Sequence, residues 1–275
     1  GLDIGTDKPT PEQRRGVVHH LIDVVEPHEP FSASRYRELA RQALEGIRAR
    51  GRLPIVCGGT GLYLRAFVDD CLVPLGHDPE LRARLERELA QLGSQELHRR
   101  LARVDPQAAA RIHPHDGRRI VRALELYTLS GVPPSRLQQE ARARARPLPA
   151  IWFGLTRPRP ELYRRIDERV DRQVQLGLVE ETRRLLASGL RAGHTAMQAL
   201  GYKEMARYLQ GRCSFAQAVD RLKRATRHYA RRQWIWFRAD PRIEWLDLSA
   251  AGSWEQAMQQ LAGRVVQRLR AATYT

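Results

Sequence analysis

A short apolar run that ends in a glycine turn most constrains the fold of this chain. Leu53 to Cys57 is continuously apolar, as expected of a strand that is covered on both faces. Gly58-Gly59-Thr60-Gly61 follows and leads at once into the apolar segment Leu62 to Val68. A strand that turns through glycines into a helix is the building unit of proteins with a parallel sheet. The sequence therefore predicts an α/β fold.

Other segments extend this unit. Val17 to Val25 is an apolar run that indicates a second strand. From Tyr36 to Ile47 the apolar residues recur with helical spacing, and Gly51 stands where that helix would end. Ile151 to Leu155 and Ile243 to Leu248 have the pattern of further strands.

The middle of the chain shows helical periodicity without a convincing strand. Asp78-Pro79 combines a capping side chain with a proline at the first helical position, and Gly93 marks the end of that helix. We therefore expect a helical insertion domain over residues 77–146. The α/β core domain would then consist of residues 1–76 and 147–275.

The charge of the chain points to phosphate-rich partners. Its 275 residues include 47 Lys plus Arg against 31 Asp plus Glu, a net charge of +16. Guanidinium groups bind phosphate oxygens bidentately and displace counterions from nucleic acids. A GC-rich coding sequence would explain the preference for arginine over lysine, but not the excess of positive charge.

The composition also argues against several classes of protein. No run approaches the roughly 18 apolar residues of a membrane span, and no amino-terminal signal is visible. The cysteines, Cys57, Cys71 and Cys213, are far apart and form no CxxC pair, so neither a disulfide framework nor a zinc module is indicated. The pairs His19-His20 and His113-Pro-His115 lack a second ligand cluster, so we expect no metal site in these residues. We expect a cytoplasmic protein.

The glycine turn has the components of an anion site. Glycines let a phosphate approach backbone amides, and the start of a helix adds partial positive charge. The turn lacks the GKT or GKS of a Walker motif. A purely structural tight turn is an equally open alternative.

Two basic helical faces favour RNA. Near the carboxyl end, arginines interleave with Tyr229, Trp234 and Trp236, and such aromatic rings stack on unpaired bases while arginines take phosphates. The alternative is a solvated charged face with its aromatic residues in the core. A second basic face carries Arg118, Arg119 and Arg122. An equally open alternative is that these arginines are ordinary surface residues without a binding role.

Seven blocks stand in order along most of the chain: GLDIGTDKP, HHLID, GGTGLYLRA, IHPHDGRRIVRALELY, LYRRIDERVD, AMQALGYKEM and TRHYARRQWIWFR. Together they resemble one family, the tRNA dimethylallyltransferases of bacterial type. The resemblance implies transfer of a dimethylallyl group from dimethylallyl diphosphate to N6 of the adenosine 3′ of the anticodon, position 37, in tRNAs that read codons starting with U. It also implies a core like that of P-loop nucleotide kinases with a helical insertion.

The resemblance assigns roles to residues of this chain. The channel where diphosphate and adenine meet would be lined by Gly58, Gly59, Thr60, Gly61 and Tyr63, and Arg169 would grip the diphosphate. Segments that match tRNA contacts contain Arg118, Arg119, Arg122, Gln198, Gly201, Tyr202, Lys203, Arg231, Arg232, Gln233, Trp236 and Arg238. The cofactor implied is Mg²⁺.

The family's catalytic residues have no counterpart in the given residues. In that family a glycine-rich P-loop with a catalytic threonine, and a DSxQ segment whose aspartate is the base, precede the match to Gly1. The core would thus be truncated at its amino terminus, and we expect residues 1–275 alone to be inactive or nearly so. The expected partners are the tRNA anticodon stem-loop and dimethylallyl diphosphate, with no membrane, and we expect a monomer. The alternatives are a non-catalytic tRNA-binding fragment and a nucleotide-kinase relative that acts on small molecules.

Overall fold

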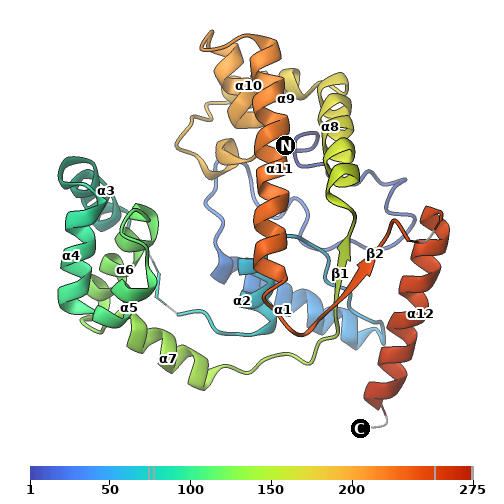
Figure 1. Cartoon of the computed structure of the whole chain (residues 1–275), viewed down its shortest axis with the longest axis horizontal. Helices are drawn as coiled ribbons and strands as arrows, with labels where there is room; N and C mark the ends of the chain where they lie inside the picture. Colours follow the sequence, from blue (N-terminus) through green and yellow to red (C-terminus); the bar gives the residue numbers. More distant parts are fainter. Residues whose placement is uncertain (74, 77, 251, 274–275) are drawn as a thin grey trace. The chain divides into compact units, whose positions relative to one another are not determined.

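Two compact units make up the chain, and each is described by itself. The structure is a computed structural model that describes residues 1–273 apart from 74, 77 and 251 (Figure 1). One unit comprises Gly1–Tyr63 and Pro149–Thr275, and the other Leu64–Leu148. The predicted insertion, residues 77–146, lies within the second unit, which begins earlier, inside helix α2 (Gly61–Val68).

In the described part of the unit Leu64–Leu148, helices are the only regular secondary structure. Asp78 caps the first long helix by accepting hydrogen bonds from the backbone N–H groups of Glu80 (2.9 Å) and Leu81 (3.1 Å). Leu97, Leu101 and Ile120 are fully buried between the helices. The helices are α3 (Pro79–Leu92), α4 (Ser94–Val104), α5 (Pro106–Arg111), α6 (Gly117–Ser130) and α7 (Pro134–Arg144).

A buried carboxylate joins three parts of this unit. Glu125 of α6 is fully buried and accepts hydrogen bonds from Arg82 (2.5 Å) and Arg122 (2.8 Å), and from the backbone N–H of Asp78 (3.3 Å). Burial alone would raise the pKa of Glu125, but the hydrogen bonds from the two arginines outweigh it and lower this pKa. The charged form of Glu125 therefore stabilises the folded unit.

We expect Glu125→Ala to lower the free energy of unfolding by about 2–3 kcal/mol, because two arginines then lose their buried partner. The lowered pKa means that the wild-type contribution is present above the ordinary glutamate pKa and is lost as the pH falls through the folded-state value. Urea unfolding at several pH values measures both effects. Glu86→Gln, on the exposed side of α3, is the control. An equal loss of stability in both variants would contradict this role.

The other unit contains a small parallel sheet. Strand β1 (Trp152–Thr156) pairs with β2 (Ile243–Asp247) in parallel, with Trp152 opposite Ile243 and Thr156 opposite Asp247 (Figure 1). Both strands were predicted. The helices of this unit are α1 (Ala33–Ala49), α8 (Arg159–Gln175), α9 (Leu178–Ala187), the short 3-10 helix η1 (Thr195–Gln198), α10 (Tyr202–Leu209), α11 (Phe215–Phe237) and α12 (Trp254–Thr273).

Two predicted strands are absent, and the α/β class rests on a smaller sheet than expected. Leu53 to Cys57 belongs to no sheet, and the side chain of Ile55 is 81% exposed rather than covered on both faces. Val17 to Val25 likewise forms no strand, because Leu21 (φ 62°) and Asp23 (φ 55°) adopt left-handed backbone conformations that interrupt an extended chain. An apolar run becomes a strand only where a neighbouring backbone pairs with it.

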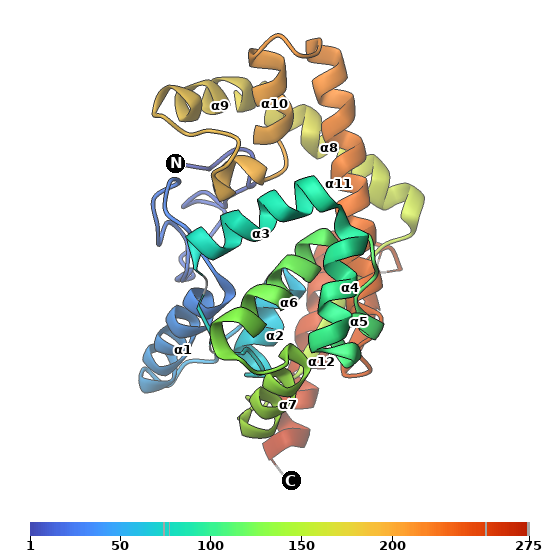
Figure 2. The ribbon, with the colours of Figure 1, turned by 90° about the vertical axis from the view of Figure 1, so that its left-hand side faces the viewer.

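One acidic side chain anchors the first residues of the chain to the helices of this unit. Glu181 of α9 is buried, and its carboxylate accepts hydrogen bonds from the backbone N–H groups of Ile4 (3.0 Å) and Gly5 (3.2 Å) and from the hydroxyl of Tyr202 (2.6 Å). Gln173 of α8 donates to the carbonyl of Ile4 at 3.0 Å. Figure 2 shows α9 and α10 beside this part of the chain.

Tyr202 also contacts the first loop of the chain, and its ring accounts for the glycine at position 5. It is fully buried, and its hydroxyl accepts a hydrogen bond from the N–H of Gly5 at 3.1 Å. A Cβ at Gly5 would lie 2.6 Å from the Tyr202 ring, so only glycine fits there. Burial, and then the neighbouring carboxylate of Glu181, raise the pKa of the Tyr202 hydroxyl, which stays protonated and donates.

Glu181→Ala should release the loop of residues 3–5, because its backbone N–H groups lose their acceptor. We expect amide hydrogen exchange at Ile4 and Gly5 to accelerate about tenfold, since one unit of log rate corresponds to roughly 1.4 kcal/mol of lost protection. Glu180→Ala is the matched control, because Glu180 is exposed and contacts Arg183. Unchanged exchange in Glu181→Ala would show that the loop is held by other contacts.

Candidate functional site

The glycine turn lies directly against helix α11. The side-chain Nε2 of Gln233 donates a hydrogen bond to the carbonyl of Gly59 at 3.1 Å. A Cβ at Gly59 would lie 1.9 Å from Nε2 of Gln233, and a Cβ at Gly61 would lie 2.1 Å from Nε1 of Trp236. A side chain at either glycine would therefore collide with α11, whereas a Cβ at Gly58 would meet nothing within 4 Å.

Backbone donors are available at this turn. Among the described residues, no hydrogen bond is made by the backbone N–H groups of Thr60, Gly61 or Leu62. The helix begins with the N–H of Tyr63 donating to the carbonyl of Thr60 at 2.9 Å. Unpaired N–H groups at the start of a helix attract anions, and Thr60 is exposed to solvent. The turn can therefore accept a phosphate group.

Tyr63 belongs to an aromatic cluster next to the turn. Its ring stacks on Tyr36 with centroids 4.8 Å apart, and it meets Phe31 edge-on. Its hydroxyl donates weakly to the carbonyl of Phe31 at 3.4 Å. Burial raises the pKa of Tyr63, so its hydroxyl is neutral near pH 7. Tyr63 thus supplies a rigid apolar wall rather than a charge.

Arg169 is held by an acidic residue that sequence reasoning missed. Its Nε lies 3.3 Å from a carboxylate oxygen of Asp7, which has a left-handed backbone (φ 54°). Arg169 makes no hydrogen bond through Nη1 or Nη2 within the described chain. These groups are the fork that binds phosphate bidentately. The block GLDIGTDKP contains two acids, Asp3 and Asp7, and the sequence alone did not indicate which of them would meet Arg169.

Some arginines on the basic face of α11 form ion pairs, and others, which are called open, form none with the described residues. Arg224 contacts Asp220 at 2.6 Å and Arg227 contacts Asp167 at 2.7 Å, so these two arginines are already neutralised. Further along, the exposed Arg231, Arg232 and Arg238 form no ion pair with any residue that the structure describes. Trp236 is 39% exposed beside them. The open positive charge is therefore at the carboxyl end of α11.

The predicted contacts of the segment 198–203 have different environments. Gln198 and Lys203 are exposed, and Gln198 donates to the carbonyl of Ala192. Gly201 is buried with φ 96°, a conformation that favours glycine. Tyr202 lies in the core, where its hydroxyl is bound to Glu181, so its side chain is not presented to a ligand. The spacing of this block could not distinguish a buried tyrosine from an exposed one.

The three arginines of α6 also differ. Arg118 and Arg119 are exposed, and Arg119 lies 3.4 Å from Asp116. Arg122 instead donates to the carbonyls of Leu75 and Gly76, both at 3.0 Å, and to Glu125. Its guanidinium therefore holds the segment that precedes α3.

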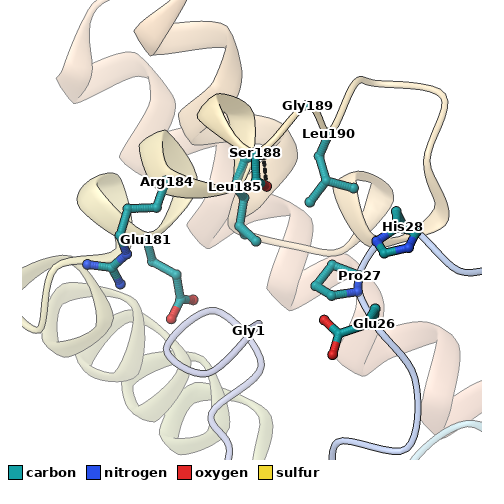
Figure 3. A pocket seen from close by; sticks show the side chains of 10 residues that line it. All are labelled: Gly1, Glu26, Pro27, His28, Glu181, Arg184, Leu185, Ser188, Gly189 and Leu190. Atoms are coloured by element: carbon teal, nitrogen blue, oxygen red, sulfur yellow. Dashed lines mark hydrogen bonds between the residues drawn. The ribbon is translucent and has the colours of Figure 1, made fainter.

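A pocket lies elsewhere in the same unit as α11. This pocket measures about 420 Å³, and none of the predicted site residues line it; Figure 3 shows His28 and Pro27 facing Leu185 and Leu190 across it. The described residues contain no group of three His, Cys, Asp or Glu side chains that could hold a metal ion. None of the helices in the described part of the chain has the length and hydrophobicity to span a bilayer.

Comparison with known proteins places these features in one family. The family model described as IPP transferase matches residues 1–240. A tRNA dimethylallyltransferase of Thermomicrobium roseum is 48% identical over 95% of this chain and 79% of its own length. One of Thermobifida fusca is 50% identical over 91% of this chain and 77% of its own length.

Solved structures are similar along nearly the whole chain. The tRNA isopentenylpyrophosphate transferase of Bacillus halodurans has a TM-score of 0.69 and 38% identity, with 99% of this chain and 85% of that chain covered. A eukaryotic dimethylallyltransferase acting on tRNA has a TM-score of 0.77 and 26% identity, with 98% and 69% covered. With the match of the family model over residues 1–240, these similarities show that the chain belongs to the IPP transferase family.

Proposed function

We propose that this chain serves tRNA prenylation: the transfer of a dimethylallyl group from dimethylallyl diphosphate to N6 of adenosine 37, next to the anticodon, in tRNAs that read codons starting with U. The names of the relatives support the reaction class, and the family resemblance supports the finer assignment to adenosine 37 and to this set of tRNAs.

One observation carries the proposal: a turn with free backbone donors lies against the helix that bears open arginines and an exposed tryptophan. The N–H groups of the exposed residues Thr60 and Leu62 suit a diphosphate, and the carboxyl end of α11 suits RNA. A prenyl transfer to RNA needs both ligands side by side, because the reacting atoms must approach to about 3–3.5 Å. The contact between Gln233 and Gly59 brings the two surfaces together.

The chemistry is a displacement at the allylic carbon. The bond between this carbon and the diphosphate oxygen breaks, the diphosphate leaves with the electron pair, and N6 forms the new C–N bond and loses a proton. The free N–H groups of the turn and the Nη groups of Arg169 would stabilise the negative charge that grows on the leaving group. Tyr63 and Tyr36 would exclude water from the allylic carbon.

Mg²⁺ is part of this proposal as a partner of the diphosphate. Because no described residues form a three-ligand cluster, the ion would take its ligands chiefly from phosphate oxygens and water, which Mg²⁺ retains readily. No step above depends on it. The RNA would contact the exposed residues of the predicted set: Arg118, Arg119, Gln198, Lys203, Arg231, Arg232, Trp236 and Arg238.

Substituting both Arg231 and Arg232 with alanine should weaken binding of an anticodon stem-loop and reduce the slope of log affinity against log salt by roughly 1–2, because up to two phosphate contacts are lost. Fluorescence anisotropy at several salt concentrations measures this. Arg224→Ala is the control, since Arg224 is paired with Asp220. Equal affinity of wild-type protein for the stem-loop and for an unrelated hairpin of the same length would argue against a tRNA substrate.

Residues 1–275 alone should transfer little or no dimethylallyl group to an anticodon stem-loop. The family resemblance assigns the base for N6 and the P-loop threonine to segments outside these residues, and the loss of such groups costs several orders of magnitude in rate. Incorporation of labelled dimethylallyl into RNA is the measurement. Robust turnover would show that a base within residues 1–275 suffices. Binding of RNA without any binding of pyrophosphate would favour the alternative of a non-catalytic tRNA-binding fragment.

A further inference from the structure

We infer that Gln233 is a positioning residue for the diphosphate turn, in addition to its place on the helix that faces RNA. The inference rests on the proposed function, because it assigns Gln233 to the diphosphate site of the same reaction. It starts from the hydrogen bond between Nε2 of Gln233 and the carbonyl of Gly59 (3.1 Å), which joins residues far apart in the sequence.

The hydrogen bond from Gln233 fixes the direction of the Gly59 carbonyl and, through the same peptide plane, that of the Thr60 N–H. The peptide bond between Gly59 and Thr60 is planar and trans, so its C=O and N–H groups point in opposite directions. Because Gln233 holds the carbonyl of Gly59 toward α11, the N–H of Thr60 points away from α11. The N–H of Thr60 makes no hydrogen bond within the described chain. By holding the carbonyl of Gly59, the carboxamide of Gln233 therefore keeps this unpaired N–H directed away from α11.

The peptide between Gly59 and Thr60 has little local restraint, since the hydrogen bond from the N–H of Tyr63 holds the next peptide through the carbonyl of Thr60. Glycine at positions 58, 59 and 61 allows many backbone conformations, and an unrestrained peptide plane between Gly59 and Thr60 could rotate. Gln233 is half-buried and lies on the same face of α11 as Trp236, three residues further along, whose ring packs against Gly61. The turn is thus fixed to α11 at two points, and the contact at Gly59 sets the orientation of the peptide between Gly59 and Thr60.

The close fit makes Gly59 and Gln233 dependent on each other. A Cβ at residue 59 would lie 1.9 Å from Nε2 of Gln233, which is the far end of a flexible side chain. Gly59→Ala would therefore displace the carboxamide and break the same hydrogen bond that a substitution of Gln233 removes. Two substitutions that remove the same interaction do not have additive effects on affinity, so the double variant should lose no more pyrophosphate affinity than either single variant.

The principal test compares Gln233→Met with Arg232→Ala. Methionine has nearly the volume of glutamine and is a good helix former, but it cannot donate to the carbonyl of Gly59. We expect Gln233→Met to weaken binding of inorganic pyrophosphate, measured by calorimetry, about fivefold, the factor expected for one lost hydrogen bond. Binding of the anticodon stem-loop should change less than twofold. Arg232→Ala, a neighbouring exposed residue, should show the opposite pattern.

The second measurement does not require any ligand. In uniformly ¹⁵N-labelled protein, the amide order parameters of Thr60 and of the neighbouring Gly59 and Gly61 should fall from about 0.85 toward about 0.6 in Gln233→Met and remain unchanged in Arg232→Ala. Gly59→Ala should weaken pyrophosphate binding as Gln233→Met does, and the double variant should be no weaker than either single variant. Thermal unfolding of each variant verifies that it is folded.

Failure of the positioning role of Gln233 and failure of the proposed diphosphate site would give different results. Loss of RNA affinity in Gln233→Met, with unchanged pyrophosphate affinity and unchanged amide order parameters, would overturn the positioning role. Additive losses in the double variant would also overturn it. If wild-type protein binds no pyrophosphate, the proposed diphosphate site fails, while the amide order parameters still decide whether Gln233 holds the turn.

Discussion

The arrangement of the larger unit depends on the buried carboxylate of Glu181. This group accepts hydrogen bonds from the backbone of residues 3–5 and from Tyr202, and it thereby joins the first loop of the chain to α9 and α10. Several donors directed at one carboxylate offset the cost of burying its charge. Because Asp7 follows this anchored loop and contacts Arg169, the anchor also determines where that guanidinium lies.

A second constraint operates where α11 meets the glycine turn. A helix can approach a turn this closely only where the turn lacks side chains, and Gly59 and Gly61 provide that space for Gln233 and Trp236. The same contact makes the free N–H groups of the turn and the open arginines of α11 neighbours. Under the proposed function, recognition of a diphosphate and recognition of RNA would share one structural element, as a reaction between two such substrates requires.

The success of sequence-based prediction differed with the range of the interactions involved. Helices with a capping residue and an amphipathic face, such as α3 with Asp78 and Gly93, were predicted nearly to the residue, because their determinants are local. The run Leu53 to Cys57 was wrongly predicted as a covered strand, since a strand depends on a partner that may be distant in sequence. The roles of Tyr202, Arg122 and Asp7 were missed because each depends on a contact with a distant residue.

By itself, the sequence determined the family, the helices of the unit Leu64–Leu148, the strands β1 and β2, and the positive charge that suits RNA. These properties depend on local spacing, on composition and on the order of motifs. The tertiary structure alone paired Arg227 with Asp167, and it alone brought Gln233 to Gly59. The physical reason is that hydrogen bonds and ion pairs act over a few ångströms, whereas their partners here are separated by many residues along the chain.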